Sequence, residues 1–292
     1  MSSTALRSGA VPVAAHASAG NPTGPSQSGS TRTGSAERWG PLWGARPDDW
    51  ARSEEQQVPG YEEAIRRVDL QPGQRVLDVG CGTGVFLRLA ADRGAVPFGI
   101  DASEALLTLA RRRVPDADLR VGDMQFLPYG DDAFDLVTAF TSVFFAADPV
   151  AALRDAGRVA KPGAPVVIQV WGPPERCEIE AMKVVVRPFL PSPPPDAPTT
   201  PPLWRPGVLE EMATKAGLSP RGAFNVSFAY EYPDAQTLGR LLVAPAGIAR
   251  LVGPDREPSV RAQIVAALAP YRTAQGGYRL HNEFRHLVAA AP

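Results

Sequence analysis

Cysteine, net charge and long apolar runs are scarce in this sequence, and each shortage excludes a class of protein. Its 292 residues include only two cysteines, Cys81 and Cys177, too few for a disulfide scaffold or a four-ligand zinc site. Thirty basic and 31 acidic residues leave a net charge of −1, so neither nucleic acid nor an anionic membrane is an expected partner. No apolar run approaches the roughly 18 residues of a membrane span. We therefore expect a soluble, cytoplasmic protein without a metal site.

The first part of the chain differs in composition from the rest. Residues 1–36 are mainly Ser, Gly, Ala, Thr and Pro, which bury too little apolar surface to offset the entropy of ordering, so we expect a disordered tail. Residues 10–19 imitate a signal peptide only faintly, because Pro12 and His16 interrupt the apolar run, and secretion is not expected. Bulky side chains begin at Trp39, and we expect residues 37–292 to form a single domain.

Predicted strands and helices alternate in the next part of the sequence. Short runs rich in β-branched residues predict strands at 75–79, 96–100, 118–121, 134–140 and 164–171. Capping residues, glycine and proline delimit predicted helices at 62–68, 85–93, 103–113 and 148–161. Strands that alternate with helices of this length predict a doubly wound α/β sheet.

Two stretches break this alternation. Residues 173–206 hold 11 of the 31 prolines, which predicts a stiff, non-helical connection. Residues 233–278 carry helical patterns around 238–243 and 260–268, after a helix near 208–216 and a strand near 223–230. We interpret segments 172–203 and 233–280 as a helical and proline-rich cap. The core then comprises residues 61–171, 204–232 and 281–290, the last segment being a final strand.

A glycine-rich turn follows the first predicted strand. The chain passes through Gly80, Gly82 and Gly84 into a helix, which brings bare backbone close to a ligand at the carboxyl edge of the sheet. A dinucleotide-binding fingerprint would need glycine where the chain has Val85, and the Gly-Lys-Ser/Thr of a P-loop is absent. No lysine occurs between residue 39 and Lys161, so we expect a ligand that carries little negative charge.

Acidic residues stand at the ends of the first three strands. Asp101 follows the glycine turn at about the spacing at which a carboxylate accepts hydrogen bonds from both hydroxyls of a ribose. After the third strand come Asp123, which can accept from an exocyclic amine, and Met124, which can cover a purine. With Asp78 they suit a cationic nucleoside without a phosphate, and S-adenosylmethionine fits this description.

Five segments, in order, resemble the successive motifs of class I S-adenosylmethionine-dependent methyltransferases, closest to the small-molecule (type 11-like) group. They are residues 76–84, 99–101, 122–124, 134–140 and 158–163. The resemblance covers residues 61–171. It implies a Rossmann-like sheet of seven strands in the order 3-2-1-4-5-7-6, with an antiparallel seventh strand supplied by the segment from Asn282.

The resemblance also implies which residues hold the cofactor. Asp78 should orient the ammonium group of its methionine end, directly or through water, and Cys81 should act as a small side chain in its loop. The full set consists of strand-end residues: Gly80, Cys81 and Gly82 at the methionine end, Asp101 and Ala102 at the ribose, Asp123 and Met124 at the adenine, and Phe140 and Thr141 at the homocysteine side.

The acceptor site is predicted from residue types alone. Candidates for its wall are aromatic: Trp50, Phe144, Trp171 and Trp204. A cluster formed by Trp39, Trp43 and Trp50 either packs the amino-terminal segment onto the cap or belongs to this wall. Aromatic residues under an enclosing cap predict a small apolar or aromatic metabolite that accepts the methyl group on O, N or C by in-line displacement.

Acid–base chemistry has few candidates in this sequence. An oxygen acceptor usually needs a general base, and His281 could reach a pocket from the start of the final strand, with a purely structural role as the alternative. Glu178 and Glu180 in the cap are further candidates. The fourth strand ends in Ala-Phe-Thr-Ser at 139–142, without the Asn/Asp-Pro-Pro-aromatic motif that family members use on flipped bases, which disfavours nucleic acid as acceptor.

Two rival functions stay open. One is a relative of the same fold that uses S-adenosylmethionine for another reaction or only binds it. The other is a nicotinamide dehydrogenase, which Val85 disfavours. Protein or peptide acceptors also stay open, as do a monomer and a homodimer. The Ala, Arg and Pro content favours a GC-rich bacterial source and secondary metabolism.

Overall fold

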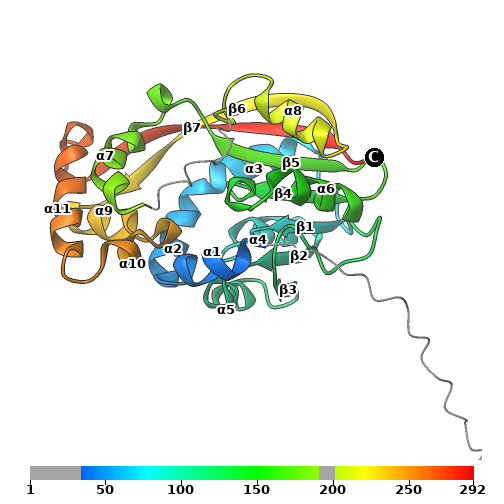
Figure 1. Ribbon diagram of the computed structural model, residues 1–292, viewed down its shortest axis with the longest axis horizontal. Helices are drawn as coiled ribbons and strands as arrows, with labels where there is room; N and C mark the ends of the chain where they lie inside the picture. The colour runs from blue at the N-terminus through cyan, green and yellow to red at the C-terminus, as the bar shows by residue number, and fades with distance from the viewer. Residues whose placement is uncertain (1–33, 191–200) are drawn as a thin grey trace, which may run out of the picture. The chain divides into compact units, whose positions relative to one another are not determined.

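The fold is built on one mixed sheet, in a computed structural model that describes residues 34–190 and 201–292. Its strands run in the order β3-β2-β1-β4-β5-β7-β6 (Figure 1). They are β1 Arg75–Val79, β2 Val96–Asp101, β3 Asp118–Val121, β4 Leu136–Phe140, β5 Pro165–Trp171, β6 Ser219–Tyr232 and β7 Tyr278–Ala290. Strands β1 to β5 pair in parallel, whereas β7 runs antiparallel to both β5 and β6. The predicted order and the antiparallel seventh strand are both confirmed.

Helices cover both faces of the parallel part of the sheet, which explains why its strands are so apolar. Every residue of β4 is buried, as expected for a strand that lies between two layers of helices. On one face pack α6 (Pro149–Val159) and α8 (Val208–Lys215), and on the other α3 (Val58–Arg67), α4 (Val85–Ala91) and α5 (Glu104–Arg113). The strands therefore present their carboxyl ends at one edge, between the two layers.

Helix caps occur where the sequence predicts them. The Ser103 hydroxyl accepts a hydrogen bond from the amide of Leu106 at the start of α5. The Asp148 carboxylate accepts one from the amide of Ala151, with Pro149 at the first position of α6. These local signals fix where each helix begins after its strand.

The amino-terminal segment contains two helices that the sequence pattern did not predict. They are α1 (Ala36–Trp43) and α2 (Pro47–Glu54), followed by a short 3-10 turn at Glu55–Gln57. Most of the predicted disordered tail, residues 1–36, lies outside the described residues. Its last residues do not behave as a tail, because Ser35 is buried and α1 begins at Ala36.

The cap is assembled on the long ends of β6 and β7. Its helices are α9 (Ala235–Leu242), α10 (Ile248–Val252) and α11 (Glu257–Ala267), with 3-10 turns at Pro245–Gly247 and Ala269–Tyr271. They share an apolar cluster with strand residues such as Tyr230 and Phe284. The described part of the proline-rich connection is less extended than predicted. It forms 3-10 turns at Pro174–Arg176, Glu178–Met182 and Arg187–Phe189 around a short helix α7 (Lys183–Val186).

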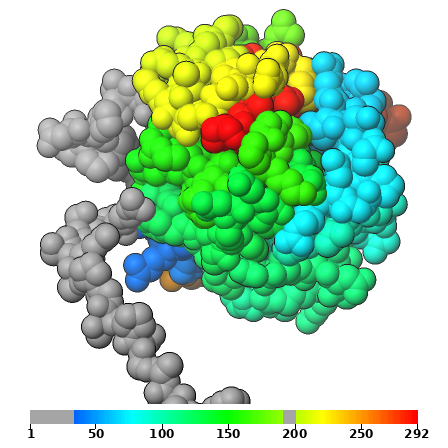
Figure 2. Space-filling model, turned by 90° about the vertical axis from the view of Figure 1, so that its right-hand side faces the viewer, coloured from blue at the N-terminus to red at the C-terminus, as the bar shows by residue number. Residues whose placement is uncertain are grey.

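Strand β7 lies inside the sheet although it follows every other strand in the sequence. Figure 2 shows its red end between the yellow segment of β6 and α8 and the green segment of β5 and α6. Within residues 34–190 and 201–292, every helix is too short or too polar to cross a bilayer.

Candidate functional site

A cavity opens at the carboxyl ends of β1, β2, β3 and β4, with about 710 Å³ of empty space that includes open solvent. Eight of the ten residues predicted to hold a cofactor line it. They are Gly80, Gly82, Asp101, Ala102, Asp123, Met124, Phe140 and Thr141. The sheet therefore brings together residues that are up to 61 positions apart in the sequence. Asp78 and Cys81 are not among the lining residues.

The glycine turn between β1 and α4 is held in a backbone conformation that other residues rarely adopt. Gly80, Gly82 and Gly84 have φ values of 83°, 53° and 79°, in the left-handed region. A Cβ atom on Gly80 would lie 2.5 Å from the Cβ atom of Ser142, a distance that real side chains do not reach. The turn therefore presents backbone, not side chains, to the cavity.

Asp101 is fixed at the end of β2 by two backbone amides. Its Oδ2 accepts a hydrogen bond from Gly82 at 2.9 Å, and its Oδ1 accepts one from Ser103 at 2.8 Å. Burial raises the pKa of this carboxyl, while the amide hydrogen bonds oppose that shift. Each carboxylate oxygen can accept a second hydrogen bond, so Asp101 can still accept hydrogen bonds from the hydroxyl groups of a ligand in the cavity.

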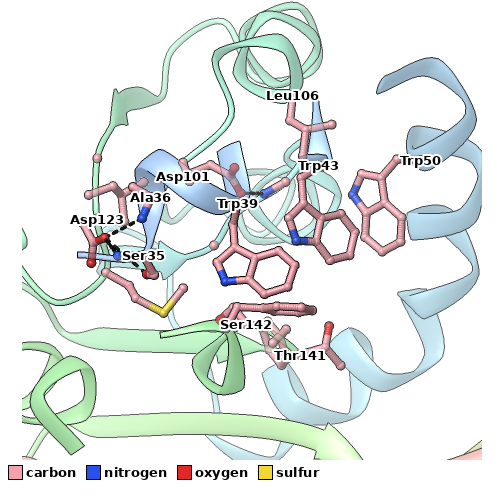
Figure 3. A pocket seen from close by; sticks show the side chains of 18 of the residues that line it. Ser35, Ala36, Trp39, Trp43, Trp50, Asp101, Leu106, Asp123, Thr141 and Ser142 are labelled. Carbon is pink, nitrogen blue, oxygen red and sulfur yellow. Dashed lines mark hydrogen bonds between the residues drawn. The ribbon is translucent and has the colours of Figure 1, made fainter. Parts of the chain in front are cut away.

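Asp123 has a role that the sequence did not indicate. Its Oδ2 accepts hydrogen bonds from the backbone amides of Ser35 and Ala36, the latter at 2.6 Å (Figure 3). Its Oδ1 accepts one from the amide of Gln125 at 2.9 Å. The carboxylate thus binds the amides at the start of α1, as an N-cap residue would. Helix α1 is anchored at the part of the cavity that was predicted to hold adenine.

Aromatic side chains form one wall of the cavity. Trp39 and Trp43 come from α1, Trp50 from α2, and Phe145 from the 3-10 turn Val143–Phe145. The rings of Trp39 and Phe145 meet edge to face with centroids 4.8 Å apart. The rings of Trp43 and Trp50, which lie side by side in Figure 3, meet in the same way with centroids 4.6 Å apart. The tryptophans therefore line the cavity, which is one of the two alternatives considered for them, and they pack on one another and on Phe145.

Thr141, at the end of β4, has an unusual backbone. Its φ is 49°, in the left-handed region that a β-branched residue enters only at a cost of roughly 1–3 kcal/mol. A hydrogen bond from its amide to the carbonyl of Gln169, at 2.9 Å, holds this conformation. Such strain is concentrated at functional sites, which agrees with a position inside the cavity.

Asp78, near the end of β1, and Cys81, within the glycine turn, are buried and do not line the cavity. Asp78 is 3% exposed, and its Oδ1 accepts a hydrogen bond of 2.7 Å from the Thr138 hydroxyl. Burial raises its pKa to about 8. Burial likewise raises the pKa of the Cys81 thiol well above its ordinary value, so a reactive thiolate is not expected there.

Several predicted acceptor residues lie away from the cavity. Trp171 packs on Phe284, with ring centroids 4.5 Å apart, in the apolar cluster of the cap. Phe144 packs against the core beneath the sheet, and Trp204 is not among the lining residues. The structure therefore brings only Trp50 of the four predicted wall residues to the cavity.

His281 also lies outside the cavity. Its side chain is 65% exposed, and its Nδ1 stands 3.5 Å from Oε2 of Glu178. Glu180 forms an ion pair with Lys183. His281 is near the start of β7, in the part of the strand that extends into the cap, which carries it away from the carboxyl ends of β1 to β4.

Sequence reasoning missed Glu54 and Tyr61, which line the cavity from α2 and α3. Glu54 is 3% exposed, and its Oε2 accepts hydrogen bonds from the amide and the hydroxyl of Thr83, both at 2.8 Å. Burial raises the pKa of Glu54 to about 7. One signal was available, because Trp50 and Glu54 are four positions apart and share a helix face. Among the described residues that line the cavity, the charged side chains are all acidic: Glu54, Asp101 and Asp123.

These features agree with comparisons to known proteins. Residues 77–168 match a family model described as a methyltransferase domain. A demethylmenaquinone methyltransferase of Renibacterium salmoninarum is 38% identical over 110 residues, which are 38% of this chain and 46% of that protein. The methyltransferase GfsG of Streptomyces halstedii is 36% identical over 114 residues, 37% of this chain and 41% of the relative. The chain thus spans about half the length of the curated relatives it matches.

The fold is also found among solved structures. The [4+2]-cyclase SpnF has a TM-score of 0.52 and 24% identity, with 80% of each chain covered. At this identity the likeness shows the fold alone. The resemblance stated from the core motifs is confirmed by the family match, and the sheet order by the structure.

Proposed function

We propose that this protein is an S-adenosylmethionine-dependent methyltransferase acting on a small molecule, since residues 77–168 match a family model described as a methyltransferase domain. The observation that carries the proposal is the cavity itself. Backbone of the glycine turn, carboxylates and aromatic rings line it, and its charged side chains are all acidic among the described residues. Such a lining suits an adenosine with a positive sulfur better than a phosphorylated nucleotide.

The cavity residues have complementary roles in holding the cofactor. Asp101 would accept hydrogen bonds from the ribose hydroxyls, and Met124 would cover the adenine beside Asp123. Gly80 and Gly82 would present backbone to the methionine end. When bound, the cofactor supplies a methyl group on a sulfonium, which is activated toward in-line displacement.

The protein would then contribute to the reaction by positioning the acceptor and by excluding water from the cavity. Holding the acceptor near attack distance in a water-excluded cavity supplies much of the acceleration of such a transfer. Phe140 and Thr141 stand at the end of β4, where the acceptor and the methyl group would meet. His281 has no part in this proposal, because its exposed side chain does not reach the cavity.

The aromatic wall supports a flat, apolar or aromatic acceptor. Rings of Trp39, Trp43, Trp50 and Phe145 offer faces and edges for stacking. The relative named demethylmenaquinone methyltransferase supports a small-molecule acceptor independently of the cavity. The methyl group would go to an O, N or C atom.

A second candidate is binding of the cofactor without methyl transfer, with another reaction in the same cavity. SpnF, to which the likeness extends in the fold alone, is named as a [4+2]-cyclase, so this fold is compatible with a reaction other than methyl transfer.

One experiment separates the two candidates. The protein is incubated with S-adenosylmethionine carrying an isotopically labelled methyl group and with a panel of phenols, demethylated quinones and amines. Label in a product supports methyl transfer, provided that the Asp101→Ala variant gives much less of it. Binding of S-adenosylhomocysteine by calorimetry without label transfer to any acceptor favours the second candidate. Absence of binding contradicts both.

A further inference from the structure

Glu54 is the charged residue that reaches the cavity from outside the sheet. It ends α2, and it precedes the segment at 77–168 that matches the methyltransferase family. Its side chain nevertheless lies against the glycine turn, because a Cβ atom on Gly82 would stand only 2.8 Å from Oε2 of Glu54. The absence of a side chain at Gly82 therefore allows a buried carboxylate to sit at the methionine end of the proposed cofactor site.

The other acidic residues near this point are committed elsewhere. Asp78 is buried, is bonded to Thr138 and does not line the cavity. Asp101 accepts the amides of Gly82 and Ser103, and the proposed function assigns its remaining capacity to the ribose hydroxyls. Asp123 binds the amides that start α1. Glu54 is thus a cavity-lining carboxylate at the glycine turn to which the proposed function assigns no part of the ligand.

Glu54 retains capacity for another donor. Its Oε2 accepts two hydrogen bonds from Thr83 at 2.8 Å. Its Oε1 accepts one long hydrogen bond, of 3.4 Å, from the amide of Val85. A charged carboxylate offers about four acceptor positions, so at least one side of Oε1 is available to a cation.

The surroundings of Glu54 do not neutralise its charge. Arg113, from α5, donates to the carbonyl and hydroxyl of Thr83 and to Glu55, so it attracts Glu54 only from a distance. Burial, and after it nearby acidic charges that include Glu54, raise the pKa of Tyr61 on α3, of Asp78 on β1 and of Cys81 in the turn, so none of these neighbours supplies a counter-charge. A buried carboxylate without a full counter-charge is costly, and a ligand cation would remove this cost.

We propose that Glu54 receives the ammonium group of the amino-acid end of the cofactor and thereby selects ligands that carry this group. The inference rests on the proposed function, since it assigns a residue to the same cofactor site. Glu54 would attract the ammonium group and repel the neighbouring carboxylate of the ligand, so it would orient the methionine end as well as bind it. A helix of the amino-terminal segment would then complete a site that the sheet begins.

This role predicts that ligand binding is linked to proton release. Burial raises the pKa of Glu54 to about 7, so near neutral pH the carboxyl is partly protonated before the ligand binds. An ammonium group beside it favours the charged form and lowers this pKa, which releases the proton. The proton number of binding is therefore a readout that a purely structural Glu54 would not change.

The test compares two ligands and three proteins by calorimetry at pH 7. S-adenosylhomocysteine carries the amino-acid end, whereas 5′-methylthioadenosine keeps the adenosine and the sulfur but lacks it. Wild type is compared with Glu54→Gln, which keeps an acceptor for Thr83, and with Glu62→Gln. Glu62 is a matched control on α3, with a side chain 54% exposed and a distant partner, Arg93, at 4.0 Å.

The expected result is selective. Glu54→Gln should lower the affinity for S-adenosylhomocysteine about ten- to hundredfold, which is the usual effect of losing a charge-assisted hydrogen bond. The affinity for 5′-methylthioadenosine should stay within about twofold of the wild-type value. Measurements in phosphate and in Tris, which differ in ionisation enthalpy, should show proton release on binding of S-adenosylhomocysteine to wild type and to Glu62→Gln but not to Glu54→Gln.

Other outcomes overturn the assignment. If Glu54→Gln lowered the affinity for both ligands equally, Glu54 would only support the glycine turn through Thr83. Unchanged affinity for both ligands would mean that the ammonium group lies elsewhere. If wild type binds neither ligand, the proposed function itself fails, and this result is distinct from a failure of the Glu54 assignment alone.

Discussion

Replacing His286 should remove an acid sensitivity that this side chain gives to the fold. His286 lies in β7 with no exposed surface, and its ring stacks on Phe224 with centroids 4.6 Å apart and an interplanar angle of 5°. Among the described residues, neither ring nitrogen has a hydrogen-bond partner. Burial lowers the pKa of His286 to about 4, from an ordinary value of 6.5.

The sign and size of the effect follow from this shift. Between pH 6.5 and about 4, the unfolded chain protonates this histidine while the folded chain does not. The unfolded state then binds more protons, so the free energy of unfolding falls as the pH falls through this window. At about 1.4 kcal/mol per pKa unit, the complete loss is about 3 kcal/mol, most of it between pH 6.5 and 4.5.

Two buried acids act in the opposite direction. Burial raises the pKa of Glu54 to about 7 and that of Asp78 to about 8. Their folded forms hold protons that the unfolded chain releases, so they make the fold more stable as the pH falls from 8 toward their ordinary values near 4. The pH dependence of wild type alone therefore mixes both signs, and only a difference between variants isolates His286.

The assay is urea unfolding followed by circular dichroism at several values between pH 4.5 and 7.5. The His286→Phe variant keeps an aromatic ring on Phe224, and His286→Leu is a second neutral variant with a different shape. The free energy of unfolding of wild type, relative to either variant, should drop by about 2 kcal/mol from pH 6.5 to 4.5. A difference that stays constant over this range would refute the reasoning, whatever its absolute value.

Three further substitutions test the site. Asp101→Ala should weaken the binding of S-adenosylhomocysteine, measured by calorimetry, by roughly 1–3 kcal/mol. An unchanged affinity would mean that the ribose lies elsewhere. Gly40→Leu should lower the free energy of unfolding in urea by about 1–3 kcal/mol, because a Cβ atom at Gly40 would lie 2.3 Å from the carbonyl oxygen of Ala102. The control Gly130→Ala should leave the free energy of unfolding unchanged, because nothing lies within 4 Å of a Cβ atom there. Equal effects of the two substitutions would contradict close docking of α1. Asp123→Ala removes the acceptor of two α1 amides and should speed proteolysis before α1, and an unchanged cleavage rate would mean that this anchor is dispensable.

Local sequence signals predicted the central part of the fold. The caps at Ser103 and Asp148 involve residues three positions apart, and the glycine turn needs its left-handed backbone whatever surrounds it. The strand order and most of the cavity-lining cofactor residues were predicted from the resemblance of five segments to the methyltransferase motifs, and not from the local signals alone.

The amino-terminal part depended on distant contacts and was not predicted. Helix α1 contains Pro41 and a glycine at its second turn, so its propensity is weak, and its start is fixed by Asp123, 87 residues away. The position of the Glu54 side chain likewise depends on a distant residue, because its hydrogen-bond partner Thr83 lies 29 residues further on. A side chain whose role is set by a remote neighbour leaves little trace in its own segment.

The acceptor residues were misplaced for a geometric reason. The pattern of β7 predicted a strand, but the strand begins at Tyr278 and continues past the other strands into the cap. Side chains near its start, such as His281, thus lie beyond the sheet edge that holds the cavity. Sequence alternation indicates the face of a strand, and it does not indicate how far the strand extends beyond its neighbours.

The insertion of β7 between β5 and β6 has a consequence for the order of folding. Strand β6 is synthesised before β7, yet along its whole length it pairs with β7 and not with β5. Until β7 is made, the edge of β5 and the edge of β6 that pair with it both lack their partner. We expect a nascent chain that stops before Tyr278 to carry two unmatched strand edges, a substrate for chaperones, until a single late segment joins the two halves.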